Sequence, residues 1–315
     1  MAALCALAGC GLGAGNTPKG VQLTVTRDFG ARVLLRKGAP RAVGEETVMS
    51  LLRRNAAVST RFGGGFVQSI DGVQGGSEGG DQVDWFYYVN GVEATKGAAA
   101  TVVHPGDRVW WDRHDWSQTD NVPAVIGSFP QPLLSGYEGK RVPVRVECVE
   151  VESTSCQGVL DRLRSLGVLA AVASVSGGDE PYTLRVLVGQ LSQLAADPGV
   201  HQIEAGPRYS GVYARFGAGA KALQLLDGKG QTVLTLGARS GLLAATRYRE
   251  EAPVWVVSGT DEAGVERAAG ALSETALRDR FAIALPETGG PIGLPVPEPV
   301  ARTAVPPAGA ANSKP

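Results

Sequence analysis

The sequence predicts an α+β protein, in which a small β-grasp-like N-terminal domain is followed by an α/β domain of alternating strands and helices. Three observations predict this class. In the first 120 residues, two strand-like runs precede one amphipathic helix and several further strands. Between residues 142 and 285, apolar strand-like runs alternate with helical patterns. Proline-rich segments follow each of these parts.

These patterns divide the chain into five expected parts. Residues 1–20 are a lipoprotein signal and linker, 21–120 the β-grasp-like domain, and 121–141 a proline-punctuated connector. Residues 142–285 form the α/β domain, and 286–315 a Pro/Ala-rich tail of disordered composition.

The composition excludes some functions. The 315 residues carry a formal net charge of −1 and only three histidines. A near-neutral chain without a polybasic face lacks the electrostatic attraction that nucleic acid exerts on basic proteins. We therefore expect no nucleic-acid partner.

The N-terminus predicts a lipid anchor. Leu7-Ala8-Gly9-Cys10 resembles the bacterial lipobox, in which the cysteine thiol accepts diacylglycerol. No basic residue precedes this run, which suggests a start codon further upstream. The alternative is an Ala/Gly-rich N-terminus with a chance cysteine. The lipobox interpretation places the protein at the cell membrane, lipid-anchored through Cys10 on the extracytoplasmic face.

The elements of the first domain follow from local patterns. Alternation predicts strands at 21–26 and 31–35, and Thr47 is a suitable cap for the amphipathic helix that follows. Strands are expected at 66–70, 84–89 and 107–111, with a glycine-rich loop at 71–80. Asn90-Gly91 predicts a tight hairpin turn.

Four motifs in this order resemble the transcobalamin-like C-terminal domain family. They are Gly44-Glu45-Glu46-Thr47-Val48, Ser69-Ile70-Asp71-Gly72-Val73, Trp85-Phe86-Tyr87-Tyr88-Val89-Asn90-Gly91 and Pro105-Gly106-Asp107-Arg108-Val109-Trp110. The resemblance covers about residues 21–116 and implies a β-grasp-like ligand-binding domain, with cobalamin as a candidate ligand. Nothing downstream resembles the helical-repeat domain that supplies the other half of the cobalamin site in the carriers.

The aromatic strands are the expected ligand site. Successive side chains of a strand point to opposite faces, so both faces of residues 85–90 carry a large ring. Rings on the face away from the helix would form a stacking platform for a planar ligand, or would instead pack as core. The candidate ligand-binding residues are Trp85, Tyr87, Tyr88, Asn90, Trp110, Trp111, His114 and Trp116.

His114 lies among carboxylates close to three tryptophans and could titrate or coordinate a metal. No second histidine or cysteine stands at ligand spacing, so a solvated or hydrogen-bonded side chain is the better interpretation. We predict no metal site and no cofactor.

In the second half, strands are expected at 142–151, from Val168, from Tyr182 and at 253–259, and the strand 184–189 leads into a short helical stretch. Ser155 is the expected cap of one helix, and another is expected at 263–277, before a strand at 281–285. Cys148 and Cys156 form a disulfide if the protein is exported, or are unpaired thiols packed as small hydrophobic side chains.

Three motif-like segments have ordinary explanations. Gly217-Ala218-Gly219 mimics a dinucleotide-binding turn, but a hairpin pattern follows it where the cofactor motif needs a helix. The turn 258–261 could bind an anion, but capping of the next helix explains it better. Leu285-Pro286-Glu287-Thr288-Gly289 resembles a sortase signal without the apolar segment and basic end that such signals require, so we interpret it as coincidence.

No catalytic constellation is recognisable, so we predict no catalytic residues and no enzyme activity. The expected function is an exported, lipid-anchored small-molecule-binding protein, for cobalamin or another planar nutrient. The alternative is a cell-surface or envelope interaction module without a small-molecule ligand, in which the aromatic rings join the two domains.

Overall fold

The computed structural model describes residues 20–38, 45–119, 121–175 and 181–297. The chain is an α+β protein, as the sequence predicts. Cys10 and the rest of the expected signal lie outside the described residues, as does the tail beyond residue 297.

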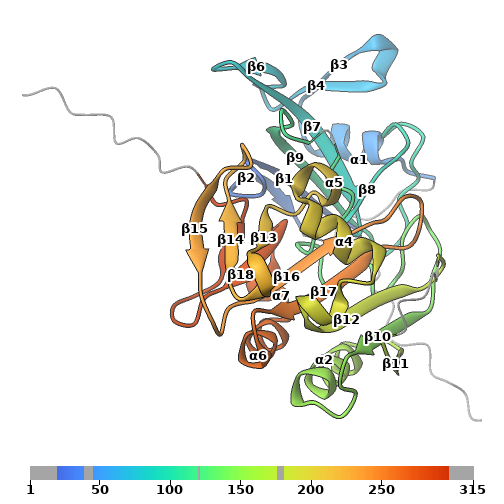
Figure 1. Cartoon of the computed structure of the whole chain (residues 1–315). Helices are drawn as coiled ribbons and strands as arrows, with labels where there is room; N and C mark the ends of the chain where they lie inside the picture. The colour runs from blue at the N-terminus through green and yellow to red at the C-terminus, as the bar shows by residue number, and fades with distance from the viewer. Residues whose placement is uncertain (1–19, 39–44, 120, 176–180, 298–315) are drawn as a thin grey trace, which may run out of the picture.

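A six-stranded sheet forms the first unit, at the top of Figure 1. Its order is β2 (Arg32–Lys37), β1 (Gln22–Arg27), β9 (Arg108–Asp115), β7 (Asp81–Val89) and β6 (Gly76–Glu78), and β8 (Val92–Glu93) also pairs with β7. Strands β1 and β9 are parallel, whereas the other pairs are antiparallel. A parallel central pair whose strands are separated in sequence by a helix that covers the sheet is the arrangement expected of a β-grasp-like unit.

Helix α1 (Val48–Asn55) covers one face of this sheet. Thr47 caps it as predicted, in a reciprocal capping box with Ser50. Val48, Met49, Leu51 and Leu52 are buried against the sheet, whereas Arg53 and Arg54 lie in the last turn. A small sheet of β3 (Val58–Arg61), β4 (Phe66–Ile70) and β5 (Val73–Gln74) adjoins this core. The expected glycine-rich loop at 71–80 therefore contains two short strands, β5 and β6.

A seven-stranded sheet forms the second unit. Its order is β11 (Ala170–Ser174), β10 (Val144–Cys148), β12 (Leu184–Gln190), β17 (Val254–Gly259), β16 (Gly241–Thr246), β18 (Ala282–Leu285) and β19 (Ile292–Leu294). The first four strands are parallel, and the remaining pairs are antiparallel. Strand β19 shows that the expected tail boundary at residue 286 is wrong, since Ile292–Leu294 complete this sheet.

Both faces of the seven-stranded sheet are covered. One face packs against α2 (Thr154–Ser165), α6 (Glu262–Gly270) and α7 (Glu274–Leu277). The other packs against α3 (Leu191–Leu194), α4 (Pro198–Ala205) and a three-stranded sheet of β13 (Ala214–Phe216), β14 (Leu223–Leu226) and β15 (Thr232–Leu236). Such double coverage explains the nearly continuous apolar runs of β12 and β17. The short helix α5 (Pro207–Ser210) follows α4.

Two helix boundaries differ from the predictions. Helix α2 begins at Thr154, because the Ser153 side chain, and not that of Ser155, accepts the backbone N–H of Cys156. The single helix expected at 263–277 is two helices, since α6 ends at Gly270 and Ser273 caps α7. In both cases, a nearby hydroxyl residue is the cap that the structure uses.

The expected connector is part of the hydrophobic core. Val125 lies with the aromatic rings between the two large sheets, while Ile126 and Phe129 belong to the core beneath α2 and α6. The Phe129 ring lies 5.8 Å from that of Trp255. The two sheets are therefore joined by buried apolar contacts and not only by the chain.

Candidate functional site

The candidate aromatic residues of β7 and β9 lie on both faces of the first sheet. Trp85, Tyr87 and Trp111 are buried on the face that packs against α1. The Trp85 indole donates to the Val73 carbonyl, and the Tyr87 hydroxyl bonds to the Thr101 hydroxyl at 2.8 Å. These three rings are core of the first unit.

The opposite face of the same strands packs against the second unit. Tyr88 and Trp110 are buried there with Val122, Val125 and Phe281, the last of which directly precedes β18. The Phe281 ring stands edge-on to Tyr88 and Trp110, with centroids 5.6 and 5.2 Å apart. Such edge-to-face pairs are a favourable aromatic geometry. This face is therefore a junction between the two sheets, and its rings do not form an open platform.

His114 is held in the same junction. Its ring stacks between Phe29 and Phe86, with centroids 4.6 and 4.5 Å away. Its Nδ1 lies 2.8 Å from Oδ1 of Asp112, a fully buried carboxylate that also accepts the backbone N–H groups of Phe29 and Gly30. These contacts hold the His114 ring in a buried hydrogen-bonded network. No group of side chains suited to a metal ion occurs among the described residues.

Asn90 occupies the predicted hairpin turn. Its φ of 56° and that of Gly91, 78°, are the left-handed conformations that an Asn-Gly turn requires. Its side-chain amide donates to Asp107 and to the Gly136 carbonyl, and its oxygen accepts the Arg108 N–H. Burial raises the pKa of the Asp107 carboxyl, although the His104 N–H and the Asn90 amide oppose that shift. Asn90 therefore fastens the hairpin to the connector.

Trp116, just beyond β9, lies beside an open hollow. Its backbone N–H donates to Gln82, and its indole N–H donates to Oδ2 of Asp84 at 2.9 Å, which fixes the ring. Burial raises the pKa of Asp84, and the Trp116 hydrogen bond opposes that rise. We call this space the Trp116 hollow; it is lined by Trp116, Arg208, Tyr209 and Arg215 and their neighbours, and its volume is about 500 Å³.

The hollow combines the two units of the protein. Residues 116–119 supply one wall, and α5, Arg215 of β13 and Gly230 supply the other. Tyr209 exposes 60% of its surface, so its ring is available to a ligand. Arg208, Tyr209 and Arg215 carried no recognisable signal in the sequence, because they come from a short helix and a strand that no binding motif marks.

A second hollow, of about 220 Å³, lies between the Asn90-Gly91 hairpin and the loop at Tyr137. Val89, Val92 and Val102 line it together with His104 and Tyr137. None of the eight candidate ligand-binding residues lines this space. The Trp116 hollow, which one of the eight lines, therefore matches the sequence prediction better than this second hollow does.

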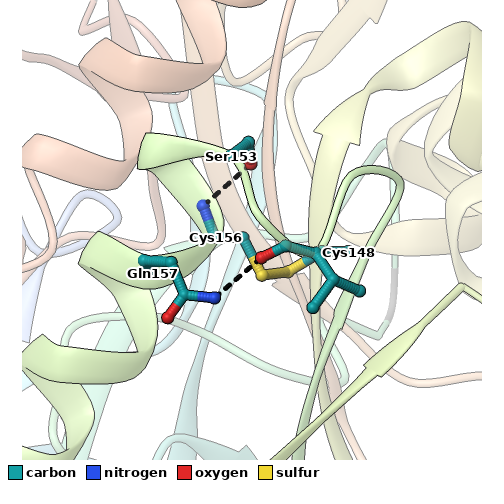
Figure 2. The surroundings of a disulfide bond; sticks show 5 residues. Cys148, Ser153, Cys156 and Gln157 are labelled. Carbon is teal, nitrogen blue, oxygen red and sulfur yellow. Dashed lines mark hydrogen bonds between the residues drawn. A yellow bond between two sulfur atoms is a disulfide. The ribbon is translucent and has the colours of Figure 1, made fainter.

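Cys148 and Cys156 are joined in a disulfide, with their Cα atoms 5.9 Å apart (Figure 2). The bond ties the end of β10 to the first turn of α2, which Ser153 caps. Gln157 adds a hydrogen bond to the Val151 carbonyl in the intervening loop.

The three motif-like segments have structural roles. Gly217-Ala218-Gly219 lies in the turn between β13 and β14, so a strand follows it where a dinucleotide-binding motif needs a helix. Asp261 caps α6 by accepting the Gly264 backbone N–H. Gly259 and Gly264 are packed closely, since a Cβ on Gly259 would lie 2.5 Å from the carbonyl carbon of Gly264. The sortase-like segment links β18 to β19.

Residues 45–115 match the sequence profile of a family described as a domain of unknown function (DUF4430). The matched stretch contains α1 and the aromatic strands β7 and β9. No curated protein and no solved structure matches the chain. Within the described part of the chain, no helix is both long enough and apolar enough to cross a membrane.

Proposed function

We propose that this protein is an exported, lipid-anchored binding protein that takes up a planar small molecule in the Trp116 hollow. The observation that carries the proposal is a fixed indole and an exposed tyrosine ring beside a hollow of about 500 Å³. Small-molecule sites typically measure about 300–1,000 Å³ and combine aromatic walls with a few polar groups.

Two further features support export and anchoring. A disulfide between Cys148 and Cys156 is typical of proteins that mature in an oxidising compartment. Leu7-Ala8-Gly9-Cys10 supplies the acceptor for a lipid. Both features support the proposed location on the extracytoplasmic face of the membrane.

The family resemblance supports a binding role. The family matched at residues 45–115 is associated with transcobalamin-like domains, which recognise a ligand without chemical conversion. Corrinoids are therefore one group of candidate ligands, beside smaller planar metabolites. The proposal includes no enzymatic activity.

Tryptophan fluorescence tests this proposal. Trp85, Trp110, Trp111 and Trp255 are buried, so a ligand in the hollow acts mainly on Trp116. Titration with corrinoids and smaller planar metabolites is expected to give a saturable change that Trp116→Ala and Tyr209→Ala weaken. Tyr182→Ala is the matched control, because Tyr182 is 79% exposed and does not line the hollow. If no compound changes either the fluorescence or the melting temperature, the proposal is wrong.

One observation favours a second candidate function, an envelope interaction module. Seven of the eight candidate ligand-binding residues are buried in core or at the junction of the sheets, and only Trp116 is not. In that case, crosslinking on cells would capture specific protein partners, and Trp116→Ala would leave the capture of those partners unchanged.

A further inference from the structure

The charge of the Trp116 hollow carries information about the ligand, and the inference drawn from it rests on the proposed function. Of the ten described residues that line the hollow, two are arginines and none is an acid. By contrast, the charged cleft beside Trp110 contains Glu274 and Asp279 together with its four basic residues. Of these two spaces, only the Trp116 hollow has positive charge without carboxylates among its described lining residues.

The two guanidinium groups have no protein partner within the described residues. Neither Arg208 nor Arg215 makes a side-chain hydrogen bond, an ion pair or a cation–π contact there, whereas Arg113 pairs with Glu78 and Arg185 pairs with Asp197. Arg208 and Arg215 are both exposed residues. Their charges are therefore available to a ligand.

Among the described residues, the acids close in sequence to the lining do not neutralise the hollow; Asp120 lies outside the described residues. Asp84 accepts the Trp116 indole N–H. Asp115 accepts hydrogen bonds from the backbone N–H and the hydroxyl group of Ser117. Lys229 pairs with Asp81. Glu204 precedes the lining residue Ala205 but is not itself part of the lining. Within the described part of the chain, no carboxylate therefore lines the hollow beside Arg208 and Arg215.

Gly206 leaves space for one of these groups. A Cβ at this position would lie 2.8 Å from Nη2 and 2.9 Å from Nε of Arg215. The guanidinium thus lies directly over the backbone between α4 and α5, at the edge of the hollow. The absence of a side chain at residue 206 permits this position.

We propose that the Trp116 hollow selects planar ligands that carry a carboxylate or a phosphate. The ring of the ligand packs on Trp116 and Tyr209, and Arg208 and Arg215 bind its negative group. Guanidinium groups suit this role because they stay charged, present several donors in one plane and match carboxylate or phosphate geometry.

Calorimetric titration of the full oxidised chain with three matched probes tests the charge preference. The probes are 2-naphthoate, the neutral 2-naphthamide and 2-naphthyltrimethylammonium. We expect naphthoate to bind roughly tenfold or more tighter than the amide, because a charge-assisted hydrogen bond contributes about that factor, and the cation to bind weakest. Phenyl phosphate, compared with phenol, tests whether phosphate replaces carboxylate.

Substitutions assign the preference to the two arginines. In the double variant Arg208→Gln and Arg215→Gln, naphthoate is expected to lose its advantage over the amide, while Arg164→Gln, on an exposed position of α2, leaves it unchanged. If the amide binds wild-type protein as tightly as naphthoate does, the anion preference is wrong but the binding function stands. If no probe binds, both proposals fail.

Collisional quenching checks the potential in the hollow without a ligand. Iodide and caesium approach the partly exposed Trp116, whereas the other four tryptophans are buried. At low ionic strength, the ratio of iodide to caesium quenching is expected to exceed that of free N-acetyltryptophanamide roughly threefold or more, and the double arginine variant to remove that excess. A ratio in the wild-type protein no higher than that of N-acetyltryptophanamide would overturn the inference.

Discussion

Removal of the Phe281 ring is expected to weaken the whole fold. Phe281 exposes only 3% of its surface, and its ring meets those of Phe29, Tyr88, Trp110 and His114 edge-on at 5.2–5.6 Å. Phe281→Ala deletes these contacts and leaves a cavity between two sheets that cannot easily collapse. Such buried Phe→Ala changes cost about 3–5 kcal/mol, and we expect the upper half of that range.

The assay is urea unfolding at 25 °C, followed by tryptophan fluorescence and far-ultraviolet circular dichroism. Both signals are expected to shift together, since the ring contacts both sheets. Phe62→Ala is the matched control: this side chain is 86% exposed at the end of β3, so its loss is expected to change stability by less than about 0.5 kcal/mol. If Phe281→Ala costs no more than Phe62→Ala, the junction does not stabilise the protein and this reasoning is refuted.

Three other changes test separate parts of the structure. Reduction of the Cys148–Cys156 disulfide, at a sequence separation of 8, is expected to lower the unfolding free energy by about 2.5 kcal/mol; equal urea midpoints with and without reductant would contradict this. Burial raises the folded-state pKa of Asp107 above its usual value of about 3.9, so its contribution to stability is full below about pH 4 and is lost as the pH rises through that raised pKa. Asp107→Asn should therefore reduce the fall in melting temperature between pH 4 and pH 7. If the variant's melting temperature falls as steeply as that of the wild type, this carboxyl is not the cause. Arg185→Met leaves the Asp197 carboxylate buried without its ion pair and is expected to cost about 3–5 kcal/mol in urea unfolding, whereas Arg164→Met is expected to be neutral.

Local features of the fold were predictable because their causes are local. Thr47 caps α1 through a hydroxyl three residues from the N–H that it accepts, and Asn90-Gly91 forms its turn through two residues with positive φ. Ser153 shows where this logic ends. Three consecutive hydroxyl residues, at 153–155, all suit an N-cap, and only the packing of α2 on β10 selects one of them.

Long-range contacts could not be predicted from the sequence. Alternation predicts that Tyr87 and Tyr88 lie on opposite faces, but it does not show which face packs against α1. The residue that covers Tyr88 and Trp110 is Phe281, which follows Trp110 by about 170 positions. Likewise, Ile292–Leu294 lie among prolines that suggest a disordered tail, and they form a strand because β18 offers an edge. Arg208 and Arg215 line the same hollow as Trp116 only because α5 and β13 fold back beside the end of β9.

The buried rings and the Trp116 hollow are parts of one arrangement. The junction fixes β9 through Trp110 and His114, and the chain continues from this rigid strand directly into Trp116. The Trp116 backbone N–H then donates to the Gln82 carbonyl and its indole N–H donates to Asp84, both on the neighbouring strand β7. A ligand that packs on a ring fixed in this way loses less affinity to the ordering of protein side chains. Packing at the junction is therefore compatible with the binding proposed at its edge.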